Sequence, residues 1–171
     1  MNTPFIVKIF LLIAFWIGSA FSASNASINR IHRKGMIVAW EYHSECIEFT
    51  LEASTSGWVA IGFNSVNRLQ GSYLIMARIR EGQVEVVEHY IHHTGIYIPC
   101  IEMGVHPQIQ GISGREIGPI TQIKFSLPLT ATHVFARDLH PGTSYTLLMA
   151  YSMEDDFLHQ SAVQSLEEIH L

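Results

Sequence analysis

The sequence carries little charge, and basic residues are the scarcer sign. Of its 171 residues, 15% are charged, against roughly 25% in an average soluble domain. Ten Lys and Arg stand against fifteen Asp and Glu, which gives a formal net charge of -5. Phosphate binding needs clustered Lys and Arg, so this balance argues against a nucleic-acid partner. Intrinsic disorder is excluded because 48% of the residues are hydrophobic and can bury a core.

The short motifs of common enzyme classes are also missing. The chain contains no G-x-S-x-G nucleophile elbow, no Gly-rich phosphate loop and no paired C-x-x-C. A catalytic pair of carboxylates has no such motif and is left open. We therefore expect a non-catalytic binding module rather than an enzyme.

Long hydrophobic runs are absent except at the N-terminus. The uncharged run of residues 9–22 is fourteen residues long, shorter than the roughly 20 that span a bilayer. It follows Lys8 and ends in small residues, which is the layout of a secretory signal. We predict a signal peptide over residues 1–22, cleaved before Ala23, with an uncleaved anchor as the alternative. The mature protein is then secreted, extracellular or periplasmic, with no stable membrane span.

Cysteine is scarce, with only Cys46 and Cys100 in the chain. An exported chain with an even cysteine count permits a disulfide between them. A mature chain of about 150 residues can build an adequate core without a bridge. Cys46 lies in an apparent strand, where a buried free thiol is common. Both states of the pair are therefore open.

What the sequence does have is a succession of short β-rich runs with turn residues between them, typical of a sandwich or barrel. In one run, Ile47, Phe49 and Leu51 share a face and polar residues share the other. These runs predict about eight strands, at residues 36–42, 46–53, 57–63, 72–80, 83–93, 121–127, 144–151 and 162–170. We predict an all-β, antiparallel β-sandwich in one domain.

The connections agree with this pattern. Glu81-Gly82 joins two runs by two residues, as a tight hairpin requires. Between residues 94 and 119 the pattern dissolves, which predicts a long loop. Residues 130–139 have weak support for a short helix.

Two segments go beyond generic β character. One is the stretch GWVAIGFN at residues 57–64, and the other is residues 145–161, which end in EDDFLHQS. Together they resemble the DOMON family, named for the non-catalytic domain of dopamine β-hydroxylase. The likeness covers residues 33–171, after a short N-terminal lead at 23–32.

This resemblance implies an immunoglobulin-like sandwich that binds a ligand in a pocket between or beside its sheets. Some members look like the b-type cytochrome domain of cellobiose dehydrogenase, which holds haem between a Met and a His. Other members are described as sugar-binding or interaction modules. Fold does not decide between these functions.

The haem ligands of the cytochrome members have no clear counterparts. The resemblance expects a Met in the loop of residues 65–71, where this chain has Leu69, and a His before Ser161, where it has Gln160. Met76 and His159 are the nearby alternatives, as weak candidates for iron ligands. Met76 lies in a predicted strand, and alternation turns His159 away from the face of Gln160. The cofactor is therefore left open, with haem b disfavoured.

Other clusters could hold a metal ion. His89, His92 and His93 are close in sequence, but on a strand His89 and His93 would be about 13 Å apart, too far for one metal ion to bind both. The favoured interpretation is that these are exposed polar histidines. The acidic run Glu154, Asp155 and Asp156 could hold Ca²⁺, although a solvated loop is favoured.

We predict a module for a small-molecule or glycan ligand. The alternative is a b-type cytochrome that passes electrons to a redox partner. The aromatic members of the proposed pocket would also suit a structural core, whatever the function. The residues assigned to the pocket are Trp58, Asn64, Leu69, Met76, Tyr151, Phe157, His159 and Gln160.

Overall fold

The computed structural model describes residues 29–171. The predicted signal peptide, 1–22, and its cleavage site before Ala23 lie outside the described residues. Within residues 29–171, no helix is both long enough and apolar enough to cross a membrane.

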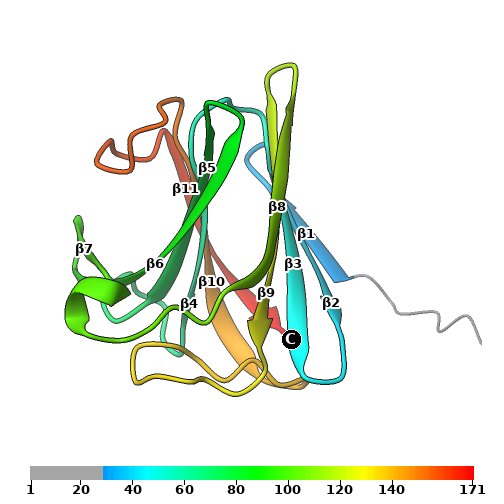
Figure 1. The fold of residues 1–171 in the computed structure, drawn as a ribbon. Helices are drawn as coiled ribbons and strands as arrows, with labels where there is room; N and C mark the ends of the chain where they lie inside the picture. The colour runs from blue at the N-terminus through cyan, green and yellow to red at the C-terminus, as the bar shows by residue number, and fades with distance from the viewer. Residues whose placement is uncertain (1–28) are drawn as a thin grey trace, which may run out of the picture.

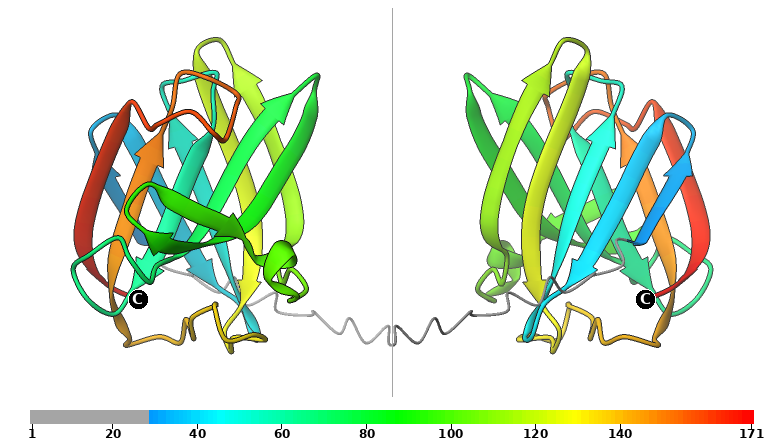
Figure 2. Two further views of the ribbon diagram at one scale, coloured as in Figure 1. Left: turned by 90° about the vertical axis from the view of Figure 1, so that its left-hand side faces the viewer. Right: turned by 90° about the vertical axis from the view of Figure 1, so that its right-hand side faces the viewer.

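Two antiparallel sheets pack face to face, as predicted for a sandwich (Figures 1 and 2). A single 3-10 turn, η1 (Cys100–Met103), is the only helical element in the described part of the chain. The five-stranded sheet has the order β1 (Asn29–Arg33), β2 (Met36–Tyr42), β3 (Cys46–Ala53), β9 (Ile120–Pro128), β8 (Gln110–Ile117). The six-stranded sheet has the order β11 (Val163–His170), β10 (Ser144–Tyr151), β4 (Val59–Asn64), β5 (Tyr73–Arg80), β6 (Gln83–His93), β7 (Ile96–Pro99).

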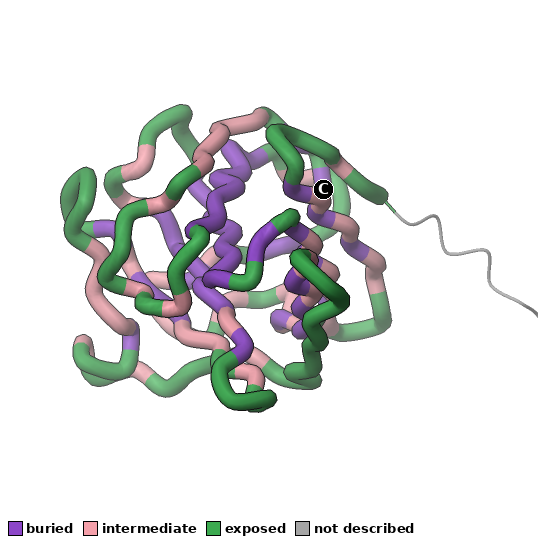
Figure 3. Tube along the Cα trace, turned by 90° about the horizontal axis from the view of Figure 1, so that it is seen from above, coloured by how far each residue is buried: buried purple, intermediate pink, exposed green. Residues whose placement is uncertain are grey.

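The main core lies between the two sheets, where the buried segments concentrate (Figure 3). The alternation predicted for β3 is confirmed, since Ile47, Phe49 and Leu51 are all fully buried. Phe49 packs across the sandwich against Phe63, with ring centroids 5.4 Å apart, and beside Phe125 at 5.9 Å. Apolar burial of this kind is the main source of stability in a sandwich.

All eight predicted strands are present, and three further strands were missed. β8 and β7 lie within residues 94–119, where we predicted a loop. β1 pairs with β2 and begins inside the expected lead of residues 23–32. These three are edge strands of their sheets. Because all of β8 is exposed, its sequence carries no alternation of buried apolar residues.

The predicted hairpin at Glu81-Gly82 is confirmed. Both residues have positive φ, 52° and 74°, as a type I′ turn requires. Lys34 and Gly35 make the same kind of turn between β1 and β2, with φ of 48° and 81°.

The short helix predicted over residues 130–139 does not form, and the segment consists of turns and bends. Its backbone is held by side chains instead. The Asp138 carboxylate accepts from the Ala131 amide at 2.8 Å, and the Tyr42 hydroxyl donates to the Leu139 carbonyl at 3.1 Å. One bond within the segment and one to β2 thus satisfy backbone groups that a helix would have paired.

The disulfide that the sequence permitted is not formed, since Cys46 and Cys100 are both free. Cys46 opens β3 in the five-stranded sheet, whereas Cys100 is buried in η1, which follows β7 of the six-stranded sheet. Burial raises the pKa of the Cys100 thiol to about 12, helped by the nearby Glu88 carboxylate, so this thiol stays protonated and inert.

Candidate functional site

The six-stranded sheet carries a second buried apolar cluster on the face turned away from the core. In antiparallel sandwiches this outer face is commonly solvated. Here it holds a set of buried residues that we call the outer apolar cluster: Trp58, Ala60, Leu74, Met76, Ile91, Leu148 and Ala150. The left view of Figure 2 looks toward this side of the sandwich.

The protein's own loops cover this cluster. Leu69 packs against it from the loop after β4, and Tyr97 packs against it from β7. Phe157 packs against it from residues 153–162, a segment that we call the covering loop. The Tyr97 hydroxyl donates to the Phe157 carbonyl. The Arg78 guanidinium lies 4.3 Å from the centroid of the Phe157 ring, as a cation–π contact. The cluster is therefore closed by side chains of the same chain.

His89 is buried beneath this cover, so the prediction of an exposed histidine is wrong at this position. Only 3% of the residue is exposed. Its ring meets Tyr97 and Phe157 edge-on, with centroids 5.4 and 6.2 Å away. Desolvation lowers the pKa of His89 to about 4, although the backbone hydrogen bond with Val87 opposes the shift. The imidazole is thus neutral near pH 7.

The other two histidines of that run are exposed, as predicted. A β-bulge between Ile91 and His93 shifts the register of β6 against β7. Among the described residues, these histidines do not join with each other or with acidic residues to form a group of three possible metal ligands.

Four of the predicted pocket residues do come together. Trp58 and Met76 lie in the outer apolar cluster, and Leu69 and Phe157 pack against it. They form a filled contact rather than an open pocket, because the covering loop closes over them.

The remaining predicted pocket residues lie elsewhere. The Asn64 amide is buried and holds the following loop, donating to the carbonyls of Arg68 at 2.8 Å and Gln70 at 2.9 Å. Tyr151 belongs to the main core, and its hydroxyl donates to the Lys34 carbonyl. His159 and Gln160 are exposed on the covering loop.

The two weak candidates for haem ligands do not fit that group. Met76 is 1% exposed and packed within the outer apolar cluster. The His159 side chain is 58% exposed, and its Nδ1 lies 3.2 Å from the Asp156 carboxylate. Haem iron needs its axial ligands on opposite sides of one porphyrin. The buried Met76 thioether and the solvent-exposed His159 imidazole therefore do not make such a pair of ligands.

The acidic run of the covering loop is not a convergent site for calcium. The Asp156 carboxylate accepts from the Leu158 amide, which lowers the pKa of Asp156, and the neighbouring His159 acts in the same direction. Across residues 29–171, one group brings three metal-ligating side chains within 4.8 Å of one another: Glu41, His43 and Glu48. The Lys124 ammonium lies 2.7 Å from Glu48 Oε1. The Glu48 carboxylate is therefore already paired with a positive charge.

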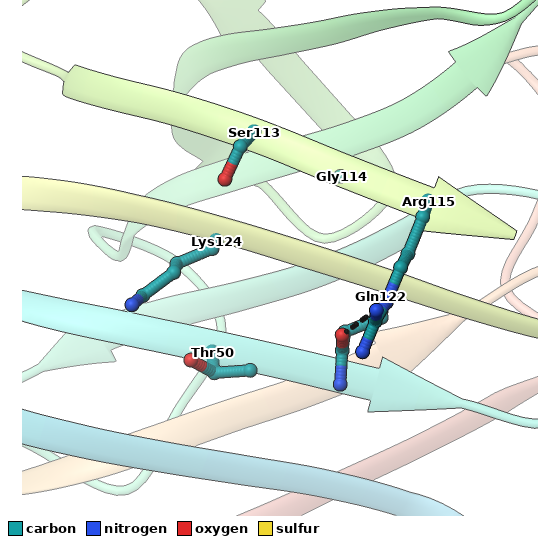
Figure 4. A pocket seen from close by; sticks show the side chains of 6 residues that line it. All are labelled: Thr50, Ser113, Gly114, Arg115, Gln122 and Lys124. Carbon is teal, nitrogen blue, oxygen red and sulfur yellow. Dashed lines mark hydrogen bonds between the residues drawn. The ribbon is translucent and has the colours of Figure 1, made fainter.

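An open site does exist on the outer face of the five-stranded sheet (Figure 4). This polar depression has a volume of about 390 Å³. Residues of three neighbouring strands, β3, β9 and β8, line it: Thr50, Ser113, Gly114, Arg115, Gln122 and Lys124.

The strand register explains how the lining converges. Lys124 lies between Thr50 and Ser113, and Gln122 lies opposite Arg115. The Arg115 Nε donates to the Gln122 Oε1 at 2.9 Å, and the two side chains meet at one side of the depression (Figure 4). This site was not predicted from the sequence, because Ser113 and Arg115 belong to a segment that was expected to be a loop. The β rule of alternating faces would have found it once β8 was recognised.

Comparisons with known proteins agree with this fold. A model of the DOMON domain matches residues 32–152. The cytochrome b domain of pyranose dehydrogenase from Coprinopsis cinerea superposes with a TM-score of 0.64 at 11% identity, covering 84% of this chain and 81% of that one. The cytochrome domain of Myriococcum thermophilum cellobiose dehydrogenase gives 0.58 at 12% identity, with the same coverage. At such identities the likeness extends to the fold alone. A search of curated proteins found no match.

Proposed function

Because the chain belongs to the DOMON domain family, we propose that it is an exported, non-catalytic module that binds a glycan or another small polar ligand. The observation that carries this proposal is the polar depression on the five-stranded sheet. Its export rests on the sequence pattern of residues 1–22.

The chemistry of the lining suits a polyhydroxylated ligand. Thr50 and Ser113 offer hydroxyls, which both donate and accept, and Gln122 offers an amide. The side chains stand on paired strands, which hold their spacing more rigidly than loops do. A volume of about 390 Å³ lies within the usual range of ligand sites, roughly 300–1,000 Å³.

The outer apolar cluster gives less support for a binding site. A ligand there would have to displace Phe157 and break its contacts with Tyr97 and Arg78. The depression needs no such rearrangement, because its lining is exposed or half-buried.

The proposal is tested by screening the mature protein against a panel of oligosaccharides and measuring hits by isothermal titration calorimetry. We expect binding that weakens by about tenfold in Gln122→Ala, because a polar contact to the ligand is lost. Gln83→Ala, an exposed Gln on the other sheet, is the matched control. Equal affinity of both variants, or no oligosaccharide binding at all, would refute this assignment.

A b-type cytochrome is the second candidate, and the observation that favours it is the likeness to two cytochrome domains. Against it stand the buried Met76 and the exposed His159. An absorption spectrum of protein expressed with ample haem separates the two functions. A sharp six-coordinate spectrum lost in His159→Ala would establish the cytochrome, and we expect no stoichiometric haem.

A further inference from the structure

We propose that the polar depression selects acidic saccharides, whose rings carry a carboxylate or a sulfate beside their hydroxyls. This inference rests on the proposed function and adds the ligand class. The lining contains two cationic side chains, Arg115 and Lys124, and their hydrogen-bond and ion-pair partners support this ligand class.

Arg115 presents an open guanidinium edge. Its Nε is used in the bond to Gln122, at 2.9 Å. Among residues 29–171, neither Nη atom has a hydrogen-bond partner, and no carboxylate lies within 4.0 Å. A guanidinium binds a carboxylate or sulfate through two parallel N–H donors, so this free edge is the natural place for an oxyanion.

The orientation of Arg115 is fixed before any ligand arrives. Gln122 accepts from Arg115 through its oxygen, and its own Nε2 donates to the Glu52 carboxylate at 3.1 Å. The three side chains lie in one row, because Glu52 pairs with Gln122 and Gln122 with Arg115 across the strands. A supported side chain loses less conformational freedom on binding.

Lys124 adds a second positive charge. Its ammonium lies 2.7 Å from Glu48 Oε1, and the side chain is 46% exposed. No carboxylate lines the depression, although the chain as a whole carries a net charge of -5. Glu48 and Glu52 border the depression and pair with Lys124 and Gln122, so the place left for an anion is the unpaired Nη edge of Arg115.

A saccharide fits better than a free inorganic anion. Thr50 and Ser113 flank Lys124 on both sides and offer hydroxyls that a bare sulfate would not need. The cavity, about 390 Å³, exceeds the size of one small anion. A sugar ring with a single acidic group uses the cations, the amide and the hydroxyls together.

The experiment compares three probes by calorimetry on the mature protein: an oligogalacturonate, a heparin oligosaccharide and neutral dextran. We expect at least one acidic probe to bind at least about tenfold more tightly than dextran, and to weaken when salt rises from about 50 to about 300 mM. The acidic probe that binds better identifies carboxylate or sulfate as the recognised group.

Variants separate a specific site from general attraction to cations. Arg115→Gln should lose about tenfold in affinity for the acidic probe, because it removes the charge. Arg115→Lys should lose about as much, because Lys keeps the charge but lacks the two parallel N–H donors of the guanidinium. Arg80→Gln, an exposed arginine on the other sheet, is the matched control and should bind like the native protein. Melting temperatures confirm that the variants are folded.

The possible outcomes separate failure of the acidic selectivity from failure of the proposed glycan-binding function. Equal binding of dextran and the acidic probes would overturn the inference and leave a glycan-binding module. Selective binding of acidic probes that Arg80→Gln weakens as much as Arg115→Gln would also overturn it. No binding of any saccharide by the native protein would overturn both.

Discussion

At the scale of single residues, the burial of His89 links stability to pH. Its pKa is about 4 in the folded protein, against about 6.5 in an unfolded chain. Between these values the unfolded state binds more protons than the folded state. Stability from this group is therefore fully present above pH 6.5, falls as the pH is lowered toward 4, and changes no further below that.

His89→Phe should remove this part of the pH dependence. The difference in the free energy of unfolding between pH 6.5 and pH 4 should shrink by about 3 kcal/mol. Urea titrations across this range measure it, with His92→Gln as a control at an exposed histidine. Parallel pH profiles for the native protein and His89→Phe would contradict the burial of this ring.

Trp58 is the largest side chain of the outer apolar cluster and only 4% exposed. Trp58→Ala should lower the free energy of unfolding by about 3–5 kcal/mol, because it opens a cavity beneath the covering loop. The indole Nε1 has no hydrogen-bond partner among the described residues. Trp58→Phe should therefore cost less. Chemical denaturation measures both, and a loss below about 1 kcal/mol in Trp58→Ala would contradict the packing.

At the scale of elements, the covering loop is anchored where β10 ends. The Trp58 amide donates to the Glu154 carbonyl at 3.2 Å, and the Ser152 amide donates to the Trp58 carbonyl at 2.9 Å. Gly57 lies directly against this backbone. A Cβ at Gly57 would lie 2.5 Å from the Ser152 carbonyl oxygen and 2.6 Å from the Glu154 nitrogen. Only glycine permits this approach.

Gly57→Ala should therefore push the covering loop away from the sheet. We expect a loss of about 1–3 kcal/mol in stability, since the neighbours are backbone atoms that yield poorly. Amide hydrogen exchange should accelerate in residues 153–162. Ser56→Ala, at the exposed neighbouring position, is the control. Unchanged exchange in the loop would argue against this anchor.

At the scale of the whole molecule, a buried polar network joins three segments that are distant in sequence. Glu88 Oε1 accepts from the amides of Gln108 at 2.6 Å and Ile109 at 3.0 Å, and Oε2 lies 3.0 Å from His133 Nε2. The Gln108 side chain in turn accepts from Thr132. β6 is thereby tied both to the segment before β8 and to the loop after β9.

This network should matter for the stability of the entire domain. The side chains of Glu88 and His133 are 1% and 5% exposed, so Glu88→Leu leaves buried donors without a partner. We expect a loss of about 3–5 kcal/mol. A double-mutant cycle with His133→Gln should show coupling above about 0.5 kcal/mol in denaturation experiments. Strictly additive losses would mean that the two side chains do not interact.

How much of the fold was predictable depends on how buried each element is. The eight predicted strands have apolar residues on at least one buried face, and this periodicity is local in the sequence. The turn at Glu81-Gly82 and the stretch GWVAIGFN are local signals too. The all-β class, the sandwich and the family all followed from them. Of the eight residues predicted for the pocket, Trp58, Leu69, Met76 and Phe157 pack together in the structure, and their part in ligand binding stays a prediction.

Other features were decided only in the tertiary structure. β8 is held by hydrogen bonds to β9, and its exposed side chains leave no pattern to read. His89 is buried because a loop almost seventy residues further along folds over it. The polar depression arises from the register of three strands, which brings Thr50, Arg115 and Lys124 together. Sequence alone determined which faces are apolar, because that is a local property. Only long-range strand pairing and loop packing could determine which faces are covered and which remain open to a ligand.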